Sequence, residues 1–208
     1  MRVLLLLAAA GLTASSSRII TFDNAAIGKA PAGWIFSSAP HGGQPHWEIR
    51  KDQTARTQPY VLAQVSSGPS DHSPLAILDG LDLRDADVSV RIKPLGGKEA
   101  QAAGVVWRYR DENNYYFARA NAAEKNVSVF KVENGRRSAI LPGVKHEISP
   151  NEWCILKVSA RGNRFQIYMD HRRILQGQDN TFTGAGKVGL WTVADSVTYF
   201  DDFRVYPK

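Results

Sequence analysis

Arginine and aromatic side chains are concentrated in one stretch of the sequence, residues 107–121. This stretch contains three arginines together with Trp107, Tyr109, Tyr115 and Tyr116. Aromatic rings stack on the C–H faces of sugars and on nucleic-acid bases, and guanidinium groups offer several hydrogen bonds in one plane. Sugars and single-stranded nucleic acids are therefore the two ligand classes that this stretch suits.

The first half of the stretch has the period-two pattern of a strand, in which successive side chains point to opposite faces. We expect Trp107 and Tyr109 to face the core. Arg108 and Arg110 then share the exposed face of the same strand. This arrangement would present two guanidinium groups to a ligand.

The second half continues the pattern on the partner strand. The same rule places Arg119 and Asn121 on one face with Tyr115. A second interpretation stays open, in which the arginines form surface ion pairs with neighbouring carboxylates. The acidic partners available for such pairs are Asp111, Glu112 and Glu124.

Other matches to catalytic or nucleotide-binding motifs are weak. Residues 184–189 fit the dinucleotide fingerprint GxGxxG, but they lead into an expected strand and not into a helix whose N-terminus could hold phosphates. We interpret them as a glycine-rich turn. The pair His146-Glu147 does not continue as HExxH, and no GxSxG elbow occurs.

Two groups of residues have ligand types that suit a metal ion. His41 and His46 flank a turn and could bind a metal with Glu48, but no other ligand spacing lies nearby, so we favour polar loop histidines. Four aspartates precede a strand and offer the oxygen ligands of calcium, without the glycine and final glutamate of an EF-hand. We interpret this second group as a solvated turn. Its members are Asp79, Asp82, Asp85 and Asp87.

The single cysteine, Cys154, excludes an internal disulfide and any zinc site or redox motif built on a cysteine pair. It lies in an expected strand in which Leu156 and Val158 face the core. We therefore expect it to pack as a small hydrophobic side chain.

The elements that must position these residues are strands. From Asp87 onward, short apolar blocks end at Gly, Asn, Asp or Pro, which is typical of strands and not of amphipathic helices. The connectors 111–114, 133–135 and 161–163 are short turns, which join antiparallel neighbours because a parallel crossover needs a dozen or more residues. The predicted strands are residues 88–93, 102–110, 115–122, 127–132, 153–160, 165–170, 187–193 and 197–206.

The N-terminal third is irregular and rich in proline and glycine, and only residues 47–49, 60–64 and 75–78 look extended. We expect it to contribute edge strands and long loops. Eight or more strands in a chain of 208 residues fit one all-β domain, an antiparallel two-sheet jelly-roll sandwich.

The N-terminus has the charged, apolar and small-residue regions of a secretory signal peptide. We assign residues 1–17 to this peptide, with cleavage between Ala14 and Ser17, and residues 18–208 to the domain. The apolar run 3–12 is too short for a stable membrane anchor. We therefore expect a secreted or periplasmic protein without membrane insertion after cleavage.

The composition and net charge reduce the number of ligand classes that the chain could bind. With 43% hydrophobic and 22% charged residues the chain is an ordinary globular protein. Its formal charge of +6 falls to +5 when Arg2 is removed with the signal peptide, an excess too small to indicate a nucleic-acid partner. Of the two ligand classes, the sequence therefore favours carbohydrate.

Blocks of residues along nearly the whole mature chain match, in order and spacing, the pattern of a known family. The blocks are 22–23 with 31–34, 104–108 with 113–116 and 119–121, 126–131, Trp153, 186–192, 194–196 and 200–203. They resemble exported bacterial domains with the concanavalin A-like lectin/glucanase jelly roll, catalogued as 3-keto-disaccharide hydrolase or family 16 glycoside hydrolase-like. The resemblance implies that fold, and a carbohydrate on its concave sheet.

The sequence departs from the catalytic members of this group. The strand motif Glu-x-Asp-x-x-Glu, which supplies the closely spaced carboxylates of retaining hydrolysis, does not occur. Val193 also stands where the group commonly has a lysine after the late tryptophan. The candidate sugar contacts are Arg108, Tyr116, Arg119, Asn121, Trp191 and Asp195, and the weak catalytic candidates are Asp195, Glu124 and Asp111.

Three functions stay open on this basis. The first is an exported carbohydrate-binding domain that lacks standard family 16 catalysis and requires no cofactor. The second is a hydrolase of the 3-keto-disaccharide type, in which a carboxylate works with an arginine or a metal. The third is a structural or adhesion module of the cell envelope.

A structural calcium ion is a separate expectation from the related jelly rolls, in which it often lies where the first and last strands meet. Asp23, with Asp201 or Asp202, would supply its oxygen ligands. The alternative, which we favour, is that Asp201 and Asp202 merely alternate along the last strand, one inward and one outward.

Overall fold

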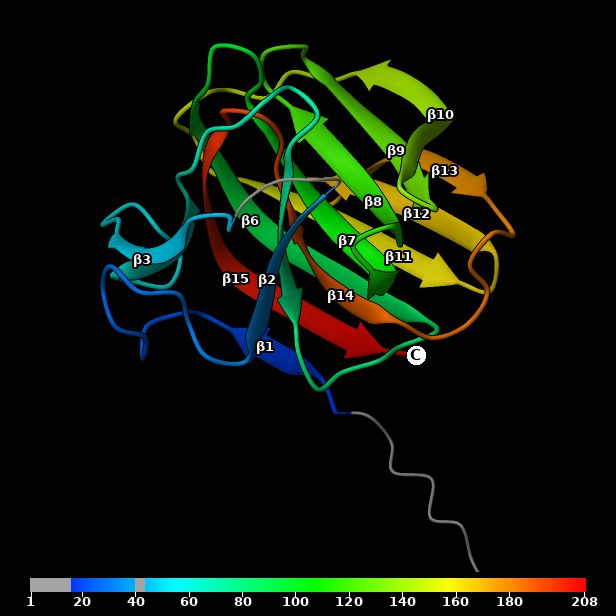
Figure 1. Ribbon diagram of the computed structural model, residues 1–208, viewed down its shortest axis with the longest axis horizontal. Helices are drawn as coiled ribbons and strands as arrows, with labels where there is room; N and C mark the ends of the chain where they lie inside the picture. Colours follow the sequence, from blue (N-terminus) through cyan, green and yellow to red (C-terminus); the bar gives the residue numbers. More distant parts are fainter. Residues whose placement is uncertain (1–15, 40–43) are drawn as a thin grey trace, which may run out of the picture.

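The computed structural model describes residues 16–39 and 44–208, and these form two antiparallel sheets packed face to face (Figure 1). All secondary structure in these two ranges is strand and turn. No helix there is long and apolar enough to cross a membrane. Most of the expected signal peptide, residues 1–15, lies outside the described residues, and so does His41.

Sheet A has eight strands, and β1 pairs with β15 beside its main path. The order along that path is β13-β12-β11-β6-β15-β4-β3. The strands are β1 (Arg18–Ile20), β3 (Trp47–Lys51), β4 (Tyr60–Gln64), β6 (Ala86–Gly96), β11 (Cys154–Arg161), β12 (Arg164–Met169), β13 (Arg172–Gln178) and β15 (Val197–Pro207).

Sheet B has seven strands in the order β10-β9-β8-β7-β14-β5-β2. Consecutive strands β7 to β10 form a meander, whereas β14, β5 and β2 come from distant parts of the chain. The strands are β2 (Trp34–Ala39), β5 (Ser73–Leu78), β7 (Ala102–Asp111), β8 (Asn114–Asn121), β9 (Asn126–Glu133), β10 (Arg136–Lys145) and β14 (Lys187–Trp191).

All eight strands predicted from Asp87 onward are present, and the predicted antiparallel all-β sandwich is confirmed. Four strands were not predicted, namely β1, β2, β10 and β13. β10 and β13 are edge strands whose polar and charged residues hide the apolar alternation, as is common for strands that must not pair further. β4 and β5 lie inside their sheets, so the expectation that the N-terminal third gives only edge strands was wrong.

The core lies between the sheets and is apolar. Sheet A contributes Leu62, Ile92 and Phe200, and sheet B contributes Val105 and Leu190, each without exposed surface. Cys154 borders this core as expected, and burial raises the pKa of its thiol to about 12. The thiol is therefore protonated and packs as a hydrophobic group.

Candidate functional site

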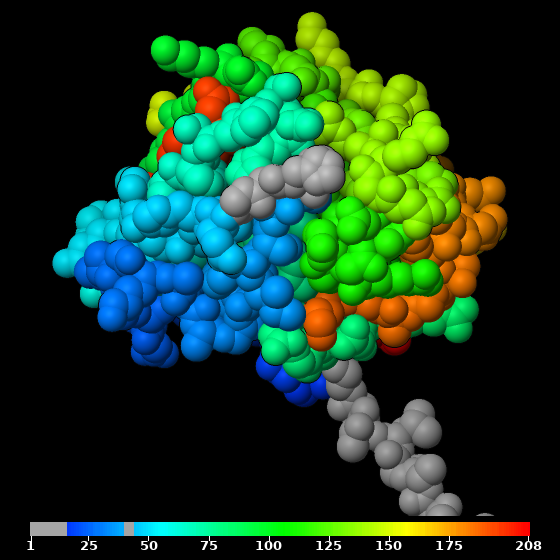
Figure 2. Space-filling model, in the orientation of Figure 1, coloured from blue at the N-terminus to red at the C-terminus, as the bar shows by residue number. Residues whose placement is uncertain are grey.

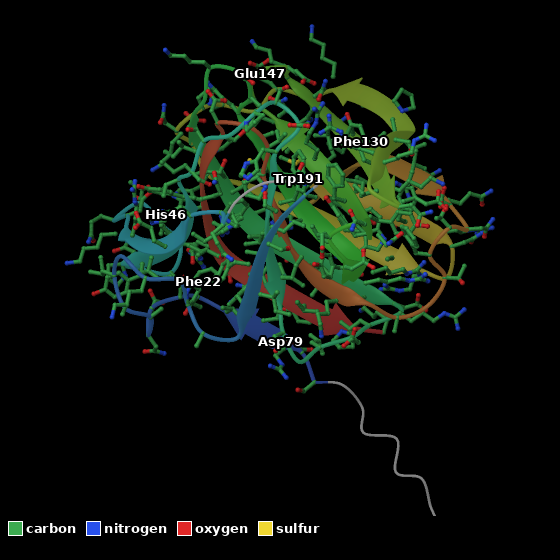
Figure 3. The ribbon with its side chains drawn as sticks, viewed as in Figure 1. Phe22, His46, Asp79, Phe130, Glu147 and Trp191 are labelled. Atoms are coloured by element: carbon green, nitrogen blue, oxygen red, sulfur yellow. The ribbon has the colours of Figure 1, made fainter. Side chains whose placement is uncertain are left out.

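Sheet B carries a second apolar cluster on its outer face, away from the inter-sheet core. Five aromatic rings form its centre, and we call them the aromatic layer. The ring of Phe117 stacks on Trp191 at 4.4 Å and on Phe130 at 5.1 Å between centroids. The layer consists of Tyr109, Tyr115, Phe117, Phe130 and Trp191. Figure 3 shows Trp191 near the middle of the sheet and Phe130 nearer β9 and β10.

The stack crosses β7 because Gly104 has no side chain. Gly104 lies opposite Trp191 on one side and Arg119 on the other in the strand register. A Cβ atom at Gly104 would lie 3.2 Å from the Trp191 side chain and 2.8 Å from the Ala118 carbonyl oxygen. The glycine therefore lets the indole of Trp191 lie over β7 and reach Phe117.

A bulge in β7 determines which residues join the layer. The pairing with β8 is interrupted after Trp107, and Arg108 has a φ of 50°. Trp107 faces the core, as expected, but the extra residue turns Tyr109 to the outer face, where its ring lies 5.9 Å from that of Tyr115. The prediction that Tyr109 faces the core was therefore wrong.

Three loop segments cover part of the aromatic layer, namely residues 68–72, 98–100 and 193–195. The backbone N–H of Ala194 donates to the carbonyl of His72 at 2.8 Å, and the N–H of Gly68 donates to the carbonyl of Ala194 at 3.2 Å. Val193 and Ala194 pack directly against the cluster. Trp191, at 0% exposure, is closed off from solvent by this cover.

Asp195 holds two of these loops together. Its carboxylate accepts the backbone N–H groups of Lys98 at 2.6 Å, Glu99 at 3.1 Å and Ala100 at 3.2 Å. These hydrogen bonds, that from Lys98 first, hold the pKa of Asp195 below its usual range against the effect of burial. The role that the structure gives Asp195 is to clamp residues 98–100 to the cover.

At Tyr115 the layer borders a hollow with a volume of about 270 Å³. Tyr115 and Val132 are apolar parts of its wall, and Asp71, Ser73 and Arg137 are its polar parts. Figure 2 shows this side of the molecule, with the segment near residue 70 (turquoise) and β10 (yellow-green) on either side of the face. Burial raises the pKa of Tyr115 above its usual range, so its hydroxyl stays neutral.

Phe130 lies beside this hollow and is half-buried. Two guanidinium groups lie over its ring, Arg119 at 5.2 Å and Arg137 at 5.9 Å from the centroid. Arg119 also pairs with Glu124, at 2.5 Å between Nη2 and Oε2, while its Nε has no hydrogen-bond partner in the described part of the chain. We call Arg119, Glu124, Phe130 and Arg137 the Phe130 patch.

Two of the six candidate sugar contacts are buried where no sugar can reach them. Arg108 is 3% exposed, and its guanidinium donates to the carbonyls of Arg84, Phe182 and Gly162. The bulge turns it inward, so the expected exposed face with Arg110 does not form. Tyr116 stacks on Trp107 in the inter-sheet core, and burial raises the pKa of its hydroxyl, hydrogen-bonded to Asp179, to about 12.

The other four candidates share the outer side of sheet B but differ in access. Arg119 and Asn121 lie on one face with Tyr115, as predicted. Asn121 is 1% exposed, and its side-chain oxygen accepts the N–H groups of the turn at Ala123 and Glu124. Trp191 is covered and Asp195 is the loop clamp, so Arg119 is the member of the set that reaches the surface next to the hollow.

The three weak catalytic candidates lie apart from one another, and each forms hydrogen bonds or an ion pair with other protein groups. Asp111 accepts hydrogen bonds from the backbone of Asn113 at 2.8 Å and the side chain of Asn114 at 3.0 Å, which closes the β7–β8 turn. Glu124 forms the ion pair with Arg119, and Asp195 holds its loop. The structure thus brings none of them together as a pair of catalytic carboxylates.

The predicted calcium ligands are likewise bonded to protein groups. Asp201 accepts the N–H of Thr57 at 2.8 Å, and Asp202 forms two hydrogen bonds with Arg204 at 2.7 and 2.9 Å. Asp23 accepts from the N–H of Tyr60 at 3.4 Å. A bulge between Asp201 and Arg204 interrupts simple alternation, and both aspartates are buried. Among the described residues, no group of three or more His, Cys, Asp or Glu side chains could hold a metal ion.

The acidic cluster and the glycine motif have structural partners too. Asp79 and Asp82 face Lys187 at 3.4 and 3.2 Å, and Asp85 accepts the N–H of Gly162 at 2.8 Å. Residues 184–189 form the turn into β14, and the described part of the chain has no helix to complete a nucleotide site. His46 pairs with Glu48 at 3.1 Å.

Sequence reasoning missed Phe130, Arg137, Asp71 and Ser73. Phe130 lay within a predicted strand, and alternation from Val127 and Val129 would have placed it on the outer face with Arg119. Arg137 lies on β10, which was not predicted. Asp71 and Ser73 reach the hollow through the crossover of β5, for which the local sequence carries no signal.

Known proteins are similar to this chain in sequence and in fold. No protein-family model matches the chain. Over 119 residues it is 32% identical to levanase from Bacillus subtilis (strain 168), a match that covers 57% of this chain and 16% of the length of that protein.

Two solved structures fix the fold type. The carbohydrate-binding module CBM66 from Bacillus subtilis superposes with a TM-score of 0.65 and 25% identity, over 82% of this chain and 93% of that chain. The β-glucanase of Bacillus licheniformis superposes with a TM-score of 0.60 and 12% identity, over 93% and 99%. The predicted concanavalin A-like lectin/glucanase jelly roll is thus confirmed, and the chain is similar to carbohydrate-binding jelly-roll modules.

Proposed function

We propose that this chain is an exported carbohydrate-binding domain that holds its glycan on the Phe130 patch and the adjoining hollow, without standard family 16 catalysis. One observation carries the proposal: a half-buried aromatic ring, stacked on Phe117 and with two guanidinium groups over it, lies beside a polar hollow. Export rests on the signal-peptide pattern of residues 1–17.

The chemistry of the patch suits a sugar. Planar guanidinium groups held over an aromatic ring offer several N–H donors to sugar hydroxyls, and the apolar C–H face of a pyranose or furanose packs on the aromatic surface that they leave uncovered. Arg119, Arg137 and Asp71 supply donors and acceptors at that rim. The stack of Phe117 on Trp191 keeps the platform rigid, which reduces the entropy that binding must overcome.

The comparisons support a carbohydrate ligand and suggest where to start. CBM66 is a carbohydrate-binding module by name, and the levanase is named for levan. Levan is therefore the first polysaccharide to test. The engagement of Asp111, Glu124 and Asp195 in separate structural contacts supports binding without cleavage.

A glycan array followed by isothermal titration with levan and the best array ligands tests this proposal. We expect saturable binding that Phe130→Ala and Arg137→Gln each weaken by about tenfold or more, a change of about 1.4 kcal/mol. Tyr168→Ala, which removes an aromatic ring from the outer face of sheet A, should bind like the wild type. Chromatography of the incubated glycan should show it intact.

Three results would contradict the proposal. If the wild type binds no glycan, its ligand is not a carbohydrate. If Phe130→Ala binds as tightly as the wild type, the Phe130 patch is not the binding site. Release of shorter sugars or cleavage of a 3-keto-glycoside would replace binding with hydrolysis as the function.

A further inference from the structure

A second hollow lies on the opposite side of the molecule, on the outer face of sheet A. Strands β6, β11 and β15, which are neighbours in Figure 1, form its floor. Its volume is about 270 Å³, against about 30 Å³ for one water molecule in the liquid. The space is therefore large enough for a small ligand group together with some of its hydration.

The hollow exists because a short side chain lies between two long ones. In the strand register, Ser89 on β6 lies between Lys157 on β11 and Arg204 on β15. All three belong to the lining. The long side chains form walls, and the serine leaves the space between them open with its hydroxyl at the floor.

The lining is strongly basic. It contains four cationic side chains and one carboxylate, Asp202, with His171 at the rim. Arg204 forms two hydrogen bonds with Asp202, and Lys157 pairs with Asp87 at 3.0 Å. Arg91 also lies within ion-pair distance of Asp202, so the four cations share two carboxylates and the hollow keeps an excess of positive charge.

Arg91 shows the unmet hydrogen-bonding capacity most clearly. Its Nε is buried and has no hydrogen-bond partner in the described part of the chain, and it lies 3.6 Å from Oδ2 of Asp202. A buried guanidinium N–H without a partner is costly unless a ligand or water completes it. At 3.6 Å Asp202 does not complete that bond, and each of its oxygens also accepts a hydrogen bond from Arg204.

A tight turn brings a further donor to the rim. β12 and β13 are joined by Asp170 and His171, with φ angles of 45° and 68°, as in a two-residue hairpin loop. His171 lines the hollow, opposite the loop that carries Arg56 between β3 and β4. Donors from three sides thus converge on the space above Ser89.

We propose that this hollow binds the oxyanion group of a small ligand, a phosphate, sulfate or carboxylate. Guanidinium groups bind such groups with paired, charge-assisted hydrogen bonds, and the hollow provides two of them with a serine hydroxyl beneath. The site is independent of the Phe130 patch, which lies on the other sheet. An acidic sugar and a free inorganic anion share the chemistry that it recognises.

Titration of the full domain with inorganic phosphate and sulfate, followed by amide NMR shifts at constant ionic strength, tests this site. We expect saturable shifts around Ser89, Arg91 and His171. Arg91→Gln and Arg56→Gln should each weaken binding by about tenfold, whereas Arg172→Gln, which removes an exposed charge at the start of β13 outside the lining, should leave it within about twofold. Glucose 6-phosphate and glucuronate, run in parallel, identify which carrier of the anion binds more tightly.

Two controls keep the result clear. Arg56 lies in a loop, so its variant reports on binding even if Arg91→Gln lowers the melting temperature. Phe130→Ala should bind phosphate like the wild type, which separates this site from glycan binding. Shifts that never saturate, or that are the same in Arg91→Gln, Arg56→Gln and Arg172→Gln, would overturn the proposal.

Discussion

The outer faces of the two sheets differ sharply. On sheet A, burial alternates residue by residue along β6, and the outward residues include Asp87, Ser89 and Arg91. On sheet B, residues 102–109 of β7 are buried without a break, because loops and the aromatic layer cover the second face as well. One face is thus a charged, solvated surface and the other an additional apolar cluster.

The two faces therefore contribute differently to the stability of the fold. Ion pairs on a solvated face contribute little each to the free energy of unfolding, whereas a covered aromatic cluster behaves like core. The same cluster makes a rigid floor for the Phe130 patch. We therefore expect ligand binding on sheet B to depend on packing and ligand binding on sheet A to depend on charge.

Removing the centre of the aromatic layer should have the largest effect. Trp191→Ala leaves a cavity beneath the cover, and we expect it to lower the free energy of unfolding by about 3–5 kcal/mol. Tyr168→Ala on sheet A should change it by only about 0.5 kcal/mol. Urea denaturation measures both, and equal effects of the two substitutions would remove the distinction between the faces.

A buried arginine should matter more than an exposed one. Arg108→Gln leaves the carbonyls of Arg84, Phe182 and Gly162 without their donor, so we expect a loss of about 2–4 kcal/mol. Arg161→Gln removes a partly exposed partner of Asp87 and should cost about 0.5 kcal/mol. A small effect at Arg108 in urea denaturation would contradict its structural role.

Loosening the cover should have a smaller effect. Asp195→Asn replaces a carboxylate that accepts three backbone N–H groups, and we expect a loss of about 1 kcal/mol. Hydrogen exchange should become faster at residues 98–100 and unchanged along β6. Uniform acceleration across both sheets would show instead that Asp195 does not act locally.

The smallest effect that we expect is the loss of stability in acid that comes from the charged outer face of sheet A. Burial alone would raise the pKa of Asp87, but hydrogen bonds from Ser159, Lys157 and Arg161 outweigh it and lower the pKa to about 2 from an ordinary 3.8. Its contribution to stability is therefore complete above pH 3.8 and is lost as the pH falls towards 2. In urea denaturation, the free energy of unfolding of Asp87→Asn should fall less steeply between pH 3.8 and 2 than that of the wild type. The same pH dependence in both proteins would show that the Asp87 ion pairs do not cause the loss.

The contrast between the faces also explains what the sequence could predict. Period-two alternation identified the strands β6, β11 and β12, and in β11 the inward Leu156 and Val158, because their outer face meets water. It failed at Arg108 and Tyr109, since a bulge moves the pattern by one residue and local sequence does not announce it.

The candidate site was predictable only in part. The concentration of arginine and aromatic residues indicated β7 and β8, and of the residues it suggested Arg119 belongs to the proposed patch. Its neighbours in the hollow come from β5, β9 and β10, which the topology brings together over long distances in the chain. Tyr116 was misplaced because two adjacent tyrosines face opposite sides of one strand, and only the packed structure shows which side is the core.

The most direct test of glycan binding on sheet B is an amide NMR map of the glycan that the array identifies, recorded on the intact domain. We expect saturable shifts at Phe117, Arg119, Phe130 and Arg137, with sheet A unchanged and with the midpoint of the titration raised about tenfold or more in Phe130→Ala. Shifts centred on β6, β11 and β15, or on the N-terminal residues 19–34, would contradict this expectation.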